Sequence, residues 1–177
     1  MNKRVWRIVP GDKNHRDTIL GKFLRGDYVA VGWLLWTPNL TNVPEDQFES
    51  RVDPAMSGME KKVVHDFRYE MRKGDTVIVS ADGKIYAIGE IMSDYYYGEE
   101  KGQRTAWRSC FKSKQDMVWP LGGISYPHRR NVSWKKILKL GFDKIPKKVA
   151  RRLGNPPALI ELSQDDWVLL SLAIIAE

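Results

Sequence analysis

The sequence predicts an α+β fold in which short α-helices surround a small curved β-sheet or pseudo-barrel. Two observations predict it. Short β-branched stretches alternate with segments of helical periodicity along the chain, and one tight hairpin joins two of those stretches. We find no internal repeat and no low-complexity segment, so we expect residues 1–177 to form a single domain.

The first elements are a strand, a helix and a second strand. The alternating stretch VWRIV at 5–9 predicts the first strand. The segment NHRDTILGKFLRG predicts a helix, with Asn14 as its N-cap and Gly26 as the residue that ends it. YVAVGW at 28–33 predicts the second strand.

Two helices and the hairpin come next. Pro44 and two acidic residues open a short helix at 44–52. Apolar residues at i+4 spacing predict a helix at 58–74 that ends at Gly74. The strands DTVIVS and KIYAIGEI flank Ala81-Asp82-Gly83, a hairpin turn in which the glycine supplies a positive φ.

The C-terminal part adds two strands and two helices. NVSWKKIL at 131–138 predicts a strand that leads into a helix, and IPKKVARRLG at 145–154 predicts a basic helix. ALIEL at 158–162 predicts a strand, and SQDDWVLLSLAIIAE a serine-capped apolar helix. Because this last helix stops without a C-cap, we expect the chain to be the N-terminal part of a longer protein.

The composition is that of a folded globular protein. Hydrophobic residues make up 42% and charged residues 29% of the chain. No apolar run reaches the eighteen or so residues of a membrane span, and the first residues carry no export signal. Cys110 is the single cysteine and forms no internal disulfide. These features predict a cytoplasmic location.

The positive charge is concentrated in one segment. The net charge is +7, yet the stretch 129–152 alone carries ten Lys or Arg against the single acid Asp143, which leaves −2 for the rest. Such asymmetry indicates a polyanion bound on one face, and nucleic acid is favoured over a merely solvated surface.

Catalytic and metal-binding signatures are weak. The three histidines and the cysteine have no metal-ligand spacing, and no phosphate-binding glycine loop is present, so no cofactor or metal is expected. One pattern resembles a metal-dependent nuclease, namely Asp53 followed by Glu60 and Lys62. Since Glu60 falls in the first turn of a predicted helix, ordinary solvated surface is the favoured interpretation.

The tryptophans divide into two groups. Trp6, Trp134 and Trp167 stand among apolar neighbours and are expected in the core. The other four stand at a strand end or in polar, glycine- or proline-containing segments, where rings can line a cavity; they are Trp33, Trp36, Trp107 and Trp119. A flat apolar wall suits an extruded nucleobase, and stacking contributes roughly 1–3 kcal/mol per base.

Several motifs in register resemble one family. VWRIVPG, VAVGW, MRKGDTVIV, GKIYAIGEI followed by YYYG, and RRNVSW together resemble an EVE domain. EVE domains belong to the PUA-like group, which includes the YTH readers of N6-methyladenine. The basic segment resembles more narrowly the N-terminal DNA-binding domain of archaeal McrB-type restriction proteins. The resemblance implies a pseudo-barrel and a non-catalytic module that recognises a base flipped out of DNA.

The resemblance also implies a site. The family's tryptophans fall on Trp33 and Trp119 as walls of an aromatic cage, with the Leu34 carbonyl near the base and Trp36, Trp107 or the Tyr95–Tyr97 run as a third wall. Polar residues after the first strand would read the base edge, namely Asp12, Asn14 and His15. Phosphates would be held by the basic residues Arg129, Arg130, Lys147, Lys148, Arg151 and Arg152.

Several functions remain open from sequence. The main hypothesis is a reader of N6-methyladenine in double-stranded DNA, which would direct a McrBC-type complex with a McrC-type nuclease as a possible partner. The first alternative is a reader of methylated RNA, and the second is the metal-dependent nuclease. A structural domain that binds an acidic protein through its basic face is a further possibility.

Overall fold

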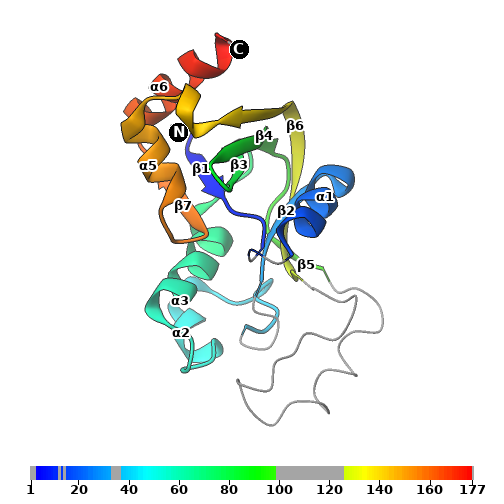
Figure 1. Ribbon diagram of the computed structural model, residues 1–177. Coiled ribbons are helices and arrows are strands. Elements are labelled where there is room, and N and C mark those ends of the chain that lie inside the picture. The colour runs from blue at the N-terminus through cyan, green and yellow to red at the C-terminus, as the bar shows by residue number, and fades with distance from the viewer. Residues whose placement is uncertain (1–2, 12, 14, 33–36, 99–125, 177) are drawn as a thin grey trace.

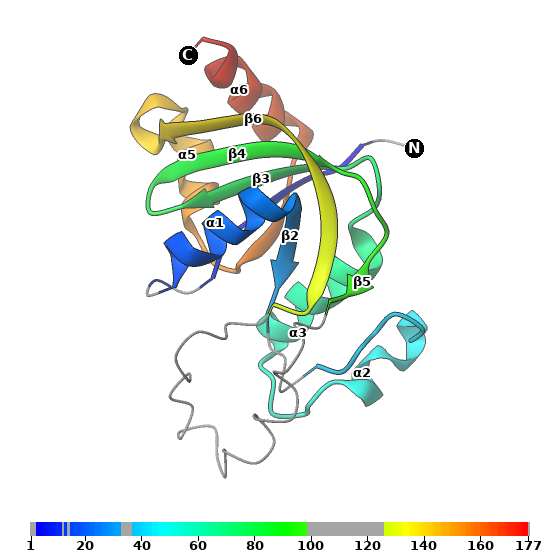
Figure 2. The ribbon, with the colours of Figure 1, turned by 90° about the vertical axis from the view of Figure 1, so that its right-hand side faces the viewer.

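The computed structural model describes residues 3–11, 13, 15–32, 37–98 and 126–176. One strongly curled mixed sheet has the strand order β2-β6-β4-β3-β1-β7, with β5 beside β6 (Figures 1 and 2). The strands are β1 Val5–Ile8, β2 Tyr28–Val31, β3 Thr76–Ala81, β4 Lys84–Ile91, β5 Tyr96–Tyr97, β6 His128–Gly141 and β7 Leu159–Leu162. The helices are α1 Arg16–Gly26, α2 Phe48–Arg51, α3 Gly58–His65, α5 Lys147–Gly154 and α6 Gln164–Ile175. The predicted α+β class is confirmed.

Alternating side chains give the sheet a separate core on each face. Trp6 and Ile8 of β1 lie in the core that α1 and α3 cover. Val5 of the same strand lies in the core that α5 and α6 cover. Successive strand residues point to opposite faces, so one strand serves both cores. Trp6 is confirmed as core; Trp134 and Trp167 are half-buried against the two cores.

A buried arginine anchors α5 to the sheet. Arg7 of β1 is 4% exposed and donates to Ser80 Oγ at 3.0 Å, to the Pro157 carbonyl at 2.7 Å and to the Leu153 carbonyl at the end of α5. Burial lowers the pKa of Arg7 to about 10, so the side chain stays charged at neutral pH. Arg7 thus holds α5 and the following turn beside β1.

The structure confirms the predicted hairpin and differs from the prediction at the ends of α1. Asp82 and Gly83 both have positive φ (48° and 70°), as a two-residue hairpin turn requires, and the hairpin is confirmed. The residue with positive φ after α1 is Asp27 rather than Gly26. The N-cap position of α1 is His15, and the predicted cap Asn14 lies outside the described residues.

The helix predicted over 58–74 ends earlier. α3 runs to His65 and continues as a π-helical turn, Asp66–Glu70, before the chain becomes extended at Met71. Asp75 explains the change, because its carboxylate accepts the main-chain N–H of Arg72 at 2.9 Å and the indole N–H of Trp6 at 2.9 Å. A buried aspartate therefore turns the chain into β3, as expected for turn chemistry at this position.

The segment predicted as a strand leading into a helix is one strand of 14 residues, β6. It pairs with β2 and β5 near its start and with β4 along most of its length, with register shifts against β4. Pairing with distant segments supplies the hydrogen bonds that a local helix would otherwise supply, so the helical part of this prediction is wrong. None of the helices in the described ranges is long and apolar enough to span a bilayer.

Candidate nucleic-acid interface

Three chain segments meet at the end of the sheet formed by β2 and β5. Gly11 follows β1, Gly32 follows β2 and Tyr126 precedes β6. A Cβ atom on Gly11 would lie 3.2 Å from Tyr126 Oη, and one on Gly32 would lie 3.0 Å from Tyr126 Cε1. The Tyr126 ring therefore packs directly on two glycine backbones. We call this end of the sheet, defined by Gly11, Gly32 and Tyr126 with the neighbouring His128, the mouth.

A buried histidine fixes the chain on one side of the mouth. His128 is fully buried at the start of β6, and its Nδ1 lies 2.8 Å from the hydroxyl of Tyr95. Its Nε2 hydrogen-bonds the hydroxyl of Thr37, and the main-chain N–H of Leu40 donates to the Tyr95 hydroxyl at 3.3 Å. Residues 37–40 are thus tied to the start of β6.

Burial sets the protonation of the imidazole. The hydroxyls of Tyr95 and Thr37 can each donate or accept a hydrogen bond, so the neutral ring is satisfied with its proton on either nitrogen. Burial lowers the pKa of His128 to about 3, and burial also raises the pKa of Tyr95. Both groups are therefore neutral at physiological pH, and their role here is positional.

Arg129 brings positive charge to the mouth. In β6 it pairs with Ala30 of β2 on one side and Tyr96 of β5 on the other. Its guanidinium lies 4.9 Å from the centre of the Tyr28 ring, and its Nε donates to the Tyr126 carbonyl at 2.9 Å. The half-buried side chain is thus held beside the mouth in a defined orientation.

Arg130, predicted as a phosphate ligand, is buried in the structure. Its side chain is 3% exposed and donates to three carbonyls, those of Phe67 at 2.9 Å, Arg68 at 3.0 Å and Ser93 at 3.2 Å. Burial lowers the pKa of Arg130 to about 10. The carbonyls belong to the π-helical turn and to the loop before β5, so Arg130 joins these segments to β6. A phosphate contact would require it to leave them.

The other predicted phosphate residues lie on the opposite face of the sheet. Val149 and Leu153 bury the inner side of α5 in the second core, and its outer side exposes Lys147, Lys148, Arg151 and Arg152. Lys148 Nζ lies 3.4 Å, and Arg152 Nε 3.8 Å, from the carboxylate of buried Asp166. The predicted phosphate residues are therefore divided between the start of β6 and α5.

The remaining predicted site residues are placed as follows. His15 is half-buried at the start of α1, two residues from the Lys13 that follows the turn at Gly11. Tyr95 is buried in the His128 network, whereas Tyr96 and Tyr97 are half-buried. The expected cage and base-edge residues Trp33, Leu34, Trp36, Trp107, Trp119, Asp12 and Asn14 lie outside the described residues.

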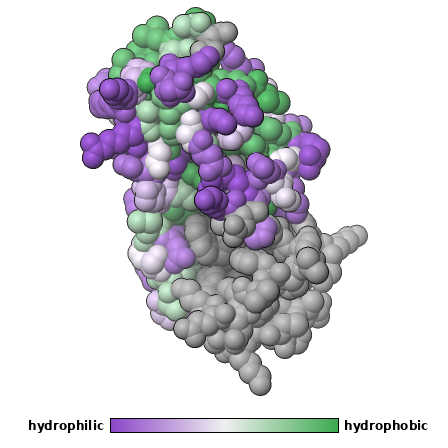
Figure 3. Space-filling view, in the orientation of Figure 1, coloured by the Kyte–Doolittle hydropathy of each residue, from purple (hydrophilic) through white to green (hydrophobic). Residues whose placement is uncertain are grey.

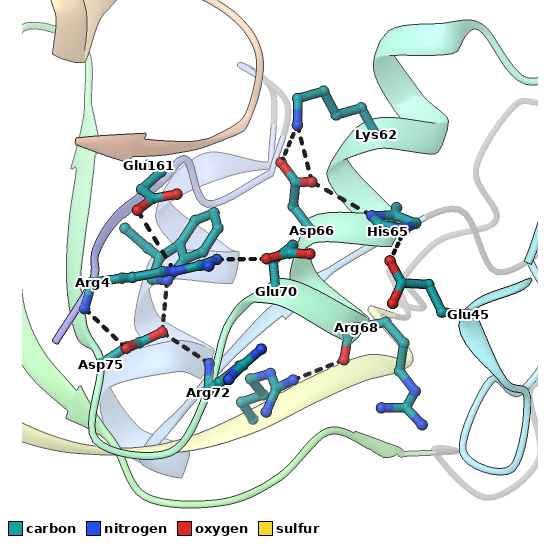
Figure 4. Close-up of polar contacts among 12 residues, drawn as sticks. Arg4, Glu45, Lys62, His65, Asp66, Arg68, Glu70, Arg72, Asp75 and Glu161 are labelled. Carbon is teal, nitrogen blue, oxygen red and sulfur yellow. Dashed lines mark hydrogen bonds and ion pairs between the residues drawn. The ribbon is translucent and has the colours of Figure 1, made fainter. Parts of the chain in front are cut away.

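A groove of about 1000 Å³ lies between α3 and the strands β1 and β7. Its charges are balanced by ion pairs, including Arg4 with Glu70 at 2.6 Å and Lys62 with Asp66 at 2.7 Å (Figure 4). The hydrogen bond from Arg4 lowers the pKa of Glu70. With its acids and bases neutralised in this way, the groove offers little net attraction to a polyanion.

The acidic residues of the nuclease-like pattern serve the backbone. Asp53 accepts the main-chain N–H of Ala55 at 2.7 Å. Glu60 accepts the main-chain N–H of Ser57 at 2.8 Å and forms a capping box with it at the start of α3. Within the described residues, no group of three or more His, Cys, Asp or Glu side chains is placed to hold a metal ion.

Sequence reasoning did not single out His128, Thr37 or Tyr126. Their partners are far away in the chain; Thr37 and His128, for example, are 91 positions apart. A histidine in an otherwise ordinary strand carries no local signal that it will be buried. The motif RRNVSW pointed to this strand, but not to the burial of its second arginine.

The curled sheet with its surrounding helices is a YTH-like fold. Solved structures of the Mmi1 YTH domain are similar, one with a TM-score of 0.51, 10% identity and coverage of 99% of this chain and 90% of that chain. A second, described as a YTH domain-containing protein mmi1 and RNA complex, has a TM-score of 0.50, 11% identity and coverage of 99% and 83%. At this identity the likeness establishes the fold.

A family model also assigns the chain to a protein family. A family model described as Domain of unknown function (DUF8426) matches residues 6–150, and the chain belongs to that family. No curated protein matches the sequence.

Proposed function

We propose that this protein is a binding module that reads a methylated base in nucleic acid at the mouth, with N6-methyladenine in RNA as the favoured target. The observation that carries the proposal is the YTH-like fold along nearly the whole chain, since one of the similar Mmi1 structures is a complex with RNA. Readers of this kind bind and do not catalyse, which agrees with carboxylates at Asp53 and Glu60 that serve the backbone.

The geometry around the mouth supports this assignment of roles. In the sequence, Trp33 directly follows Gly32, and Asp12 directly follows Gly11. Gly32 and Gly11 both lie against Tyr126, which supports roles at the mouth for the two residues that follow them. In the proposal Trp33 and Trp119 are cage walls, with Trp36 or Trp107 as a third, and the Leu34 carbonyl accepts the N6 hydrogen. Asp12, Asn14 and His15 read the base edge.

The energetics favour a stacked, methylated base. Stacking on aromatic side chains is worth about 1–3 kcal/mol per base, and a buried methyl group adds about 0.8 kcal/mol. Arg129, positioned by Tyr28, is the proposed phosphate ligand nearest the mouth. Single-stranded RNA presents bases without the unpairing that duplex DNA requires, which lowers the cost of binding.

Duplex DNA is the second candidate. The observation in its favour is the basic face of α5, which gives the protein a second region for backbone contacts away from the mouth. A role in a McrB-type restriction complex with a McrC-type nuclease remains a prediction from the sequence resemblance.

The test is a binding experiment with four oligonucleotides. RNA and duplex DNA of one sequence, each with and without a single N6-methyladenine, are titrated by fluorescence anisotropy at two salt concentrations. We expect methylated RNA to bind most tightly, and Trp33→Ala to lose ten-fold or more for methylated RNA and much less for unmodified RNA, since stacking supplies about 1–3 kcal/mol.

Trp167→Ala is the control, because Trp167 packs against the core on the other face of the sheet. It should keep the preference for the methyl group. Equal losses on methylated and unmodified RNA in Trp33→Ala, or no loss on either, would refute the cage. Tighter binding of methylated duplex DNA would reverse the choice between the two nucleic acids.

A further inference from the structure

The C-terminal helix α6 is apolar on the side that faces away from the protein. Its inner residues Leu170 and Ile174 are buried in the second core. Its outer residues are exposed, with fractions of 54% for Val168, 61% for Leu172 and 80% for Ile175. Hydrophobic surface gathers at this end of the molecule in Figure 3. A row of large exposed apolar side chains on a helix typically marks an interaction site, so this side calls for a partner.

The outer residues form one continuous stripe. Val168, Leu172 and Ile175 follow one another at spacings of four and three, which places them on one face of the helix, and Leu169 (37% exposed) widens it. We call these four residues the α6 stripe. It has the spacing by which one amphipathic helix packs against another.

The two ends of the stripe carry opposite charges. Asp165 is exposed in the first turn of α6. At the other end, Lys136 of β6 donates from Nζ to the Ile174 carbonyl at 2.8 Å, which puts a positive charge at the C-terminus of the helix. An acidic side chain therefore stands in the first turn of α6, and a cation stands beside its last turn.

We propose that the α6 stripe is the interface through which a second copy of this chain binds. In an antiparallel, two-fold arrangement centred between Leu169 and Leu172, each stripe covers the other. Asp165 of one copy then lies beside Lys136 of the second copy, and the same pair repeats across the axis. Antiparallel helices also place opposite dipole ends together.

This charge pattern selects the second copy over a nucleic acid. The apolar stripe offers no row of cations to a phosphate backbone, whereas the exposed cations of α5 stand on a neighbouring helix. A self-complementary surface requires apolar residues in the middle and opposite charges at the two ends, and the α6 stripe has both. The inference is independent of the function proposed above.

The test measures oligomeric state by sedimentation velocity over a range of protein concentrations. Wild type should sediment as a dimer at micromolar concentrations. Leu172→Glu should weaken dimerisation about 100-fold or more, because the two-fold axis brings two buried carboxylates into one apolar contact. The matched control is Ile137→Glu, which replaces an apolar side chain of similar exposure (63%) on β6 and should leave the dimer intact.

The charge pair gives an independent test. Asp165→Lys should weaken the dimer, and the double variant with Lys136→Glu should recover part of the loss. Thermal unfolding confirms that each variant is folded, as expected for exposed positions. The proposal is overturned by a wild-type protein that stays monomeric at all concentrations. It is equally overturned by Leu172→Glu without effect, or by Ile137→Glu dissociating the dimer to the same extent.

Discussion

Three consecutive residues at the start of β6 have basic side chains, and each meets a different environment. His128 is fully buried between two hydroxyls, Arg129 stacks on Tyr28 beside the mouth, and Arg130 is buried against three carbonyls. Alternation along the strand points His128 and Arg130 inward and leaves Arg129 half-exposed. Residue type alone therefore does not decide which of them can contact a phosphate.

Burial of His128 predicts a stability that depends on pH. Its pKa is about 3 in the folded protein, against 6.5 in an unfolded chain, so the unfolded state binds more protons between these values. The stability that neutral, buried His128 contributes to the fold is complete above about pH 6.5 and is lost as the pH falls toward 3. We expect the free energy of unfolding to fall by up to about 1.4 kcal/mol per pH unit from this residue.

Urea denaturation at pH 7, 6 and 5 measures how steeply the free energy of unfolding changes with pH. His128→Gln keeps a donor and an acceptor without a titrating group, and should flatten the pH dependence. An identical slope in His128→Gln and wild type would contradict this account.

At the scale of elements, β6 organises the fold. It is the strand that pairs with β2, β4 and β5, and through Arg130 it also holds the π-helical turn that follows α3. The carbonyls of Phe67 and Arg68 lie near the end of the helical segment, where main-chain acceptors need partners. The Arg130 guanidinium supplies donors to them from a strand that lies 63 and 62 positions later in the chain.

Removal of this side chain should destabilise the protein. Arg130→Ala leaves buried carbonyls without donors, and we expect a loss of about 2–4 kcal/mol in the free energy of unfolding. Arg129→Ala, one residue earlier and half-exposed, is the matched control and should cost about 1 kcal/mol or less. Urea denaturation of both variants decides the comparison, and equal losses would show that Arg130 does not anchor these elements.

At the scale of the whole molecule, the mouth and the helices α5 and α6 lie on different parts of the sheet. α6 lies at the upper end of the molecule in Figures 1 and 2, and β5 lies at the lower end of the sheet. Tyr126 of the mouth packs against the core that α1 and α3 cover, whereas α5 packs against the second core on the other face of the sheet. We therefore expect a short oligonucleotide bound at the mouth not to contact the basic face of α5.

This separation predicts different roles for two sets of cations. On a short methylated RNA, Arg129→Ala should weaken binding and lower the slope of log affinity against log salt by about 0.7, the value for one phosphate of a single strand. The double variant Lys147→Ala, Arg151→Ala should change that affinity less than two-fold and matter only on longer nucleic acid. A large loss on the short RNA in the α5 variant would mean that both regions contact one site. The preference for the methyl group should survive at high salt.

The sequence by itself determined the α+β class, the hairpin, most helices and the YTH-like resemblance, because these follow from periodicity, turn chemistry and short motifs along the chain. Tertiary structure decided the rest. It merged a predicted strand and helix into β6, buried Arg130 while leaving Arg129 beside the mouth, and put α5 on the other face of the sheet. The physical reason is that burial and strand pairing depend on partners far away in the chain, which no local pattern encodes.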